Sequence, residues 1–203
     1  FLILAIISPS GAIIRFFKKQ LEKPKIGLTR ENLFFTLTIL VALTHLLIFL
    51  YGSFSYQYLE DGDPWDHSRS IRYIASQKTA FEPSISGEGF KFMDAYPPSF
   101  DILMAVLYQV SDNLIWTLKF FNARLISLSL IFFFMFCKKM TNDPVKAFFA
   151  TLILFMIPSY MSHFIWSLTM SMVLFLPALY ALESIKDDPR WKYAAGILIG
   201  ALL

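Results

Sequence analysis

The sequence predicts an all-α integral membrane protein, a polytopic helical bundle with a structured external loop at residues 52–97. Of its 203 residues, 56% are hydrophobic and only 16% are charged. A water-soluble domain of this length would need a far more polar surface. Several apolar runs have the length of a membrane-spanning helix, and lysines and arginines collect in the loops between them. Together these observations place most of the chain in lipid.

Five apolar segments are the candidate spans, because a helix needs about 20 mainly apolar residues to cross a bilayer. Residues 32–51 and 114–137 have the longest uninterrupted apolar character. Residues 144–160 and 165–185 are expected to form an antiparallel pair joined by a very short turn. Residues 191–203 begin a further span.

The orientation follows from the charges of the loops, since basic loops stay on the cytoplasmic side. Residues 15–30 and residues 138–146 are rich in Lys and Arg. In residues 52–97, by contrast, seven acidic side chains outnumber four basic ones. We therefore expect a multi-pass protein of the cell membrane with the loop at residues 52–97 on the extracytoplasmic side.

A short apolar segment follows this loop. Residues 98–110 number about 13, too few to span a bilayer, which takes about 20. The segment follows Pro97-Pro98, which suits the start of a helix. We expect a helix that lies in, or dips into, the outer membrane interface.

The most informative polar stretch is residues 59–74, an acidic cluster that leads into a helix-start signal. Asp63 followed by Pro64 predicts an N-cap and a first helical position, with a helix over residues 64–77. Asp66 would lie near the positive helix end. Arg69 and Arg72 follow at three-residue spacing and would share a face of this helix.

This layout suits transfer from a phosphate-linked donor. A carboxylate can hold a divalent cation such as Mg²⁺ or Mn²⁺, or it can deprotonate and position an acceptor. Arginine can clamp phosphate oxygens. An equally simple interpretation is that Asp63 only caps a helix while Arg69 and Arg72 reach lipid headgroups. The spacing alone does not separate the two.

Three motifs add a family resemblance. Gly-Asp-Pro-Trp-x-x-x-Arg at residues 62–69 resembles the first external-loop motif of oligosaccharyltransferase catalytic subunits, of the GT-C superfamily. Asp61 stands at the Glu position of that motif. Tyr96-Pro97-Pro98 resembles the family's Tyr-Pro turn. Ile-Pro-Ser-Tyr-Met-Ser-His at residues 157–163 resembles its Val-Pro-Gly-Tyr-Ile-Ser-Arg segment. The three occur in the family's order across residues 32–192.

The resemblance implies a membrane glycosyltransferase. Such an enzyme would transfer a sugar or oligosaccharide from a polyprenyl-phosphate-linked donor to a protein or glycan acceptor on the extracytoplasmic side. The resemblance implies that Asp63 is the catalytic aspartate and a cation ligand, with Asp61 or Asp66 assisting. Arg69 matches the motif arginine, and Arg72 is expected to assist it at the donor phosphate. His163 stands at the family's Arg position, where it is either a further contact to the donor phosphate or saccharide or a polar residue of the aromatic belt at the membrane interface.

One departure from the family pattern bears on the metal. The family carries a second acidic motif, Asp-x-Glu, after the Pro-x-Tyr-x-Ser segment. In this chain no acidic residue lies between Asp143 and Glu183. The sequence therefore leaves the need for a divalent cation open, and also whether the donor carries one phosphate or two.

Four further charged or imidazole side chains, which the motifs do not specify, are worth considering. Arg124 is roughly 20 Å from Lys138 at helical rise, within the outer half of the bilayer. It is expected to pair with Asp101, to contact the donor phosphate, or to reach the headgroups. Lys119 is expected at the headgroups, and His45 in a helix–helix hydrogen bond. His67 follows the acidic cluster, where a histidine can be a ligand or a base.

Two other functional classes are consistent with the sequence. A transporter with an acidic outer vestibule is the main alternative, and a non-catalytic membrane scaffold is another. Nucleic acid is not an expected partner, because no large basic surface with interleaved aromatics is visible.

The extent of the chain and its cysteine content set two further limits. A single cysteine, Cys137, excludes an intramolecular disulfide. We expect a fragment, the N-terminal part of a GT-C-like transmembrane domain, because the chain begins and stops inside apolar runs.

Overall fold

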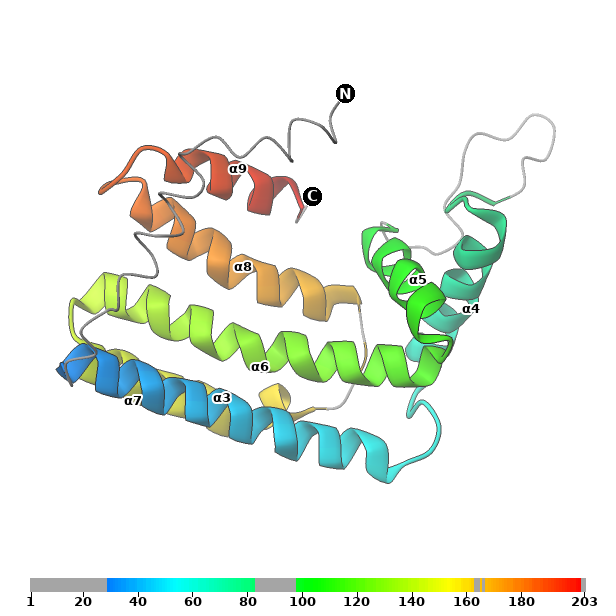
Figure 1. The fold of residues 1–203 in the computed structure, drawn as a ribbon, viewed down its shortest axis with the longest axis horizontal. Helices are drawn as coiled ribbons and strands as arrows, with labels where there is room; N and C mark the ends of the chain where they lie inside the picture. The colour runs from blue at the N-terminus through cyan, green and yellow to red at the C-terminus, as the bar shows by residue number, and fades with distance from the viewer. Residues whose placement is uncertain (1–28, 83–97, 163–164, 166, 202–203) are drawn as a thin grey trace, which may run out of the picture.

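The computed structural model describes residues 29–82, 98–162, 165 and 167–201, and every regular element in these ranges is a helix (Figure 1). The all-α fold class is therefore confirmed for this part of the chain. In chain order the helices are α3 (Arg30–Ser55), α4 (Gly62–Gln77), α5 (Ser99–Ser111), α6 (Leu114–Thr141), α7 (Pro144–Met156), the 3₁₀ helix η1 (Pro158–Met161), α8 (Ser167–Ser184) and α9 (Trp191–Gly200).

Three of these helices, α3, α6 and α8, are long and apolar enough to cross a membrane. They contain most of the predicted spans at residues 32–51, 114–137 and 165–185. α7 is a 13-residue helix, shorter than the span predicted at residues 144–160 and than the length of about 20 residues that a bilayer needs. α9 begins at the first residue of the segment 191–203, where the sequence predicts the start of a further span.

α6 is the central helix of the bundle (Figure 1). It packs against α3 and α7 on one side and against α8 on the other, and α9 packs on α8. α7 and α8 run in opposite directions, as predicted, but each packs on α6. The expectation of a very short turn between them is wrong, because η1 continues the chain after Ile157, where α7 has ended.

α4 and α5 form a helix pair at the end of the bundle where α3 ends and α6 begins (Figure 1). α5 confirms the short helix predicted at residues 98–110. One apolar core joins this pair to the first turns of α6. Its buried members are Leu59, Ile71, Ile74, Ala80, Phe100, Met104, Ala105, Leu114, Leu118 and Ile165.

The turns between helices follow from local sequence. Asp112 and Asn142 take left-handed backbone conformations that end α5 and α6, with φ of 54° and 53°. Asn113 then caps α6, and Asp143 caps α7 with Pro144 in its first turn. The α6–α7 and α8–α9 turns consequently lie at the end of the bundle opposite α4 and α5 (Figure 1). The basic segment at residues 138–146 therefore lies at the opposite end of the bundle from α4, as its charge predicts, while the sidedness itself remains a prediction.

Lys119 was expected at the lipid headgroups, and this prediction is wrong. Its side chain is buried, and its ammonium donates hydrogen bonds to the carbonyl oxygens of Ser53 (2.7 Å) and Tyr56. The last carbonyls of a helix have no partner within the helix, and α3 has no basic residue in its last turn. Lys119 supplies the missing donor and positive charge from the neighbouring helix α6. It thereby ties the end of α3 to the start of α6.

Replacing Lys119 by Met should destabilise the protein by roughly 2 kcal/mol, because two carbonyl oxygens lose a charged donor. The thermal unfolding midpoint of the full-length protein in detergent measures the effect. Lys146→Met removes an exposed charge from α7 and is the matched control. Equal unfolding midpoints for the two variants would contradict the capping role.

Candidate functional site

The acidic cluster forms the start of α4, with a different cap from the one predicted. Asp61, in extended conformation, is the N-cap, and its carboxylate accepts a hydrogen bond from the amide of Gly62 (2.6 Å). The prediction that Asp63 caps the helix is therefore wrong. The backbone amides of the first helical turn have no partner within the helix, so proline is tolerated at several positions of that turn. Pro64 therefore does not determine at which residue α4 begins.

The three aspartates of the cluster thus have different surroundings. Asp61 caps α4, and Asp66 forms an ion pair with Arg69 at 3.7 Å. Asp63 lies in the first turn of α4, where the positive end of the helix dipole favours a carboxylate, and its side chain is exposed. Of the three, Asp63 is consequently the one best placed to meet an incoming group.

Arg69 and Arg72 lie on the exposed face of the same helix. The opposite face of α4 is buried through Pro64, Ile71 and Ile74 at helical spacing. An exposed ion pair such as Asp66–Arg69 contributes little to stability. Both guanidinium groups are therefore available to a ligand that approaches α4 from the solvent side.

A buried His–Asp pair, which the sequence reading did not foresee, joins α4 to α5. His67 Nδ1 donates to Asp101 Oδ1 at 2.9 Å, and both side chains are almost fully buried. The His67 ring also packs on Phe100, with ring centroids 5.2 Å apart. The sequence did contain a signal for the burial of His67, because this residue lies four positions before Ile71 and therefore on the apolar face of α4. The pair fixes how α4, and hence Asp63, sits on α5.

A second polar network holds η1 against α3 and α6. His45 Nε2 donates to the carbonyl oxygen of Tyr160 (3.2 Å), while its Nδ1 contacts Ser127 Oγ (2.9 Å). The Tyr160 hydroxyl lies 2.6 Å from Ser129 Oγ. The predicted helix–helix hydrogen bond of His45 is thereby confirmed. Together these contacts fix Tyr160 by both its backbone and its side chain.

Tyr160 lines two adjoining hollows, of about 290 Å³ and 500 Å³, which we call the Tyr160 groove. Both hollows also share Met172 of α8. The walls come from α6, α7, η1 and α8, and most of the lining is apolar. The residues are Ile126, Phe133, Leu154, Ser159, Tyr160, Ser162, Thr169, Ser171, Met172, Val173, Phe175 and Leu176.

The groove and the acidic cluster are linked through the apolar core. Ile165 lies between η1 and α8, and it belongs to the same buried core as Ile71 of α4 and Phe100 of α5. Met170 of α8 packs against this core as well. Ile165 and Met170 are therefore packed against the helix pair that carries Asp63.

Of the remaining predicted donor-phosphate residues, Arg124 lies away from the groove. Arg124 is exposed on α6 and is separated from Ile126 of the groove by about 200° around the helix. It therefore points to another side of α6 than the groove. Asp101, one of its expected partners, is paired with His67. His163 lies outside the described residues.

The described residues contain no group of three or more His, Cys, Asp or Glu side chains that could hold a metal ion. The Asp63 carboxylate therefore has no complete set of cation ligands around it in that part of the chain. A divalent cation held by Asp63 remains a sequence-based prediction.

Comparison with family models, with curated proteins and with solved structures finds no match to this chain. The likeness to oligosaccharyltransferase subunits thus rests on the motifs themselves.

Replacing Asp101 by Ala should loosen α4, because His67 would remain buried without its carboxylate, at a cost of roughly 2 kcal/mol. Hydrogen exchange of the α4 amides should become faster in the full-length protein. Asp66→Ala breaks only the exposed pair with Arg69 and should leave this exchange nearly unchanged. Equal exchange rates in the two variants would contradict a structural role for the buried pair.

Proposed function

We propose that the chain is part of a membrane glycosyltransferase of GT-C type. It would transfer a sugar or oligosaccharide from a polyprenyl-phosphate-linked donor to a protein or glycan acceptor on the extracytoplasmic side. The observation that carries the proposal is an exposed carboxylate on a helix pair that shares an apolar core with Ile165 and Met170, next to the α8 residues that line an apolar groove. The three motifs at residues 62–69, 96–98 and 157–163 support the same reading.

Asp63 acts on the acceptor. Its carboxylate accepts the proton of the acceptor's attacking group as that group bonds to the anomeric carbon of the sugar. The bond between this carbon and the phosphate oxygen breaks, and the polyprenyl phosphate leaves with the electron pair. Asp61 assists by holding the first turn of α4 in place.

Arg69 and Arg72 act on the donor. Negative charge develops on the departing phosphate, and guanidinium groups in place before the reaction stabilise it. The exposed Asp66–Arg69 pair opens at little cost, since a solvated ion pair is worth about 1 kcal/mol or less. Arg69 can therefore exchange a carboxylate for a phosphate partner.

The Tyr160 groove receives the polyprenyl chain. A chain of apolar isoprene units needs an apolar surface that opens to the lipid, and the larger hollow, between α7 and α8, offers one. The hydroxyls of Ser159, Ser162 and Thr169 line the smaller hollow, nearer the connection to α8. This order puts apolar lining toward the lipid tail and polar lining toward the head of the donor.

Asp63→Asn should lower transfer by about 100-fold or more, the usual effect of removing a general base. Transfer from a polyprenyl-phosphate-linked sugar is assayed with the full-length protein in membranes, and membrane insertion should be unchanged. Asp112→Asn removes an exposed carboxylate at the end of α5 and should retain activity. Unchanged transfer by Asp63→Asn would refute the assignment.

The same assay with a chelator separates the two roles open to Asp63. A base requires no added cation, so transfer would continue in the presence of chelator. Loss of transfer on chelation, restored by Mg²⁺ or Mn²⁺, would make Asp63 a cation ligand.

A further inference from the structure

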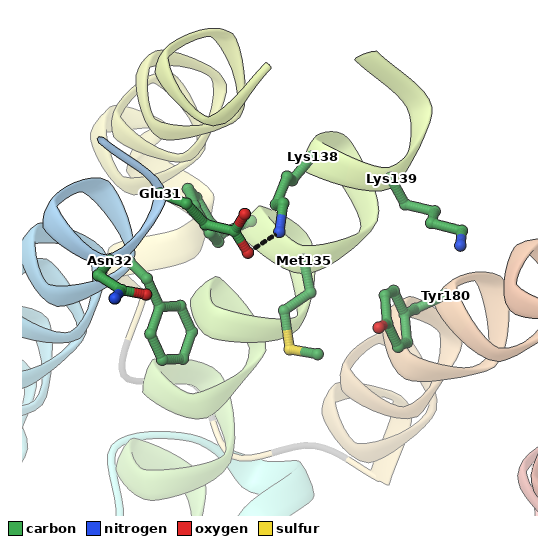
Figure 2. A pocket seen from close by; sticks show the side chains of 8 residues that line it. Glu31, Asn32, Met135, Lys138, Lys139 and Tyr180 are labelled. Atoms are coloured by element: carbon green, nitrogen blue, oxygen red, sulfur yellow. Dashed lines mark hydrogen bonds and ion pairs between the residues drawn. The ribbon is translucent and has the colours of Figure 1, made fainter. Parts of the chain in front are cut away.

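A second cavity, of about 300 Å³, lies at the end of the bundle opposite α4 and α5 (Figure 2). It is formed by the start of α3, the last turns of α6 and the second half of α8. Its apolar surface comes from Phe35, Phe134 and Met135. None of these residues takes part in the proposed transfer reaction.

Two lysines give this cavity a basic rim. Lys138 forms an ion pair with Glu31, as Figure 2 shows, and Lys139 forms one with Asp187 of the α8–α9 turn. The lysine side chains are 33% and 25% exposed, so most of each side chain is covered by the protein and part of it reaches solvent. Both carboxylate partners are more than half exposed, at 58% and 65%. They can turn into water when another anion takes their place.

The lining offers cations to an anion that displaces their present partners. Lys138, Lys139 and Glu31 line the cavity with a net charge of +1, and Asp187, which pairs with Lys139 from outside the lining, balances it until it is displaced. Tyr180 also lines the cavity, and Figure 2 shows its ring on the α8 side, facing Met135. Its hydroxyl adds a neutral hydrogen-bond donor to the two ammonium groups.

The position of the cavity indicates a lipid. α3 begins at Arg30 and α6 ends at Thr141, and both helices are candidate membrane spans. The ends of spans lie at the level of the lipid headgroups, and basic pockets between spans bind acidic headgroups there. A small soluble anion would gain nothing from Phe35, Phe134 and Met135, whereas the first carbons of an acyl chain would.

We propose that this cavity binds the headgroup of an anionic phospholipid. Lys138, Lys139 and the Tyr180 hydroxyl hold its phosphate, in place of the carboxylates of Glu31 and Asp187. Phe35, Phe134 and Met135 contact the first carbons of its acyl chains. The site ties α3, α6 and α8 together at the end of the bundle that α4 and α5 do not cover.

Native mass spectrometry of the full-length protein tests the site, with phosphatidylglycerol and phosphatidylcholine of identical acyl chains as probes. The wild type should retain phosphatidylglycerol in preference to phosphatidylcholine. Lys138→Gln with Lys139→Gln should weaken phosphatidylglycerol binding by about 30-fold, at about 1 kcal/mol for each lysine. Met135→Trp, which keeps every charge and fills the cavity, should also abolish the preference.

Lys146→Gln with Lys186→Gln is the matched control, because it removes two exposed lysines at the same end of the bundle and outside the cavity. Binding by this variant should stay within about twofold of the wild type, because neither lysine lines the cavity and neither would contact the bound headgroup. Three outcomes would overturn the proposal: an equal loss in the control, equal retention of the two lipids, or displacement of phosphatidylglycerol by inorganic phosphate.

Discussion

Two serines buried on α6 determine how the neighbouring elements meet. Ser127 contacts the His45 ring of α3, and Ser129 contacts the hydroxyl of Tyr160 in η1. His45 also binds the backbone of Tyr160, so three elements share one network. Where water is excluded, a polar group without a partner is costly, and alternative registers of these helices would leave several such groups. The network therefore selects one arrangement, and with it the shape of the Tyr160 groove.

The two ends of the bundle have different chemistry. At one end, apolar packing carries α4 and α5, and the buried His67–Asp101 pair fixes their contact. This leaves the acidic face of α4 exposed. At the other end, lysines at the end of α6 pair with carboxylates from α3 and from the α8–α9 turn. A donor site at the first end and a headgroup site at the second would occupy opposite leaflets of a membrane.

The sequence was enough to predict the long helices, because apolar length alone determines which segments suit lipid. It also predicted α4 and α5, through their turn and capping residues. It did not predict the cap of α4, since proline tolerates several first-turn positions. The burial of Lys119 and His67 was missed for another reason. Their partners are the end of α3 and Asp101, which only tertiary packing brings to them. The cavity beside Lys138 could not be predicted either, because only tertiary packing brings α3, α6 and α8 together around it.

In the proposed function, the polyprenyl chain of the donor lies in the Tyr160 groove. Photo-crosslinking of the full-length protein in membranes, with a polyprenyl phosphate that carries a diazirine on its chain, tests this directly. We expect adducts on Met172, Phe175 and Leu176, and suppression by unlabelled polyprenyl phosphate. Adducts spread equally over lipid-exposed side chains of α3 such as Leu43 and Leu47, which are 50% and 68% exposed, would contradict the account.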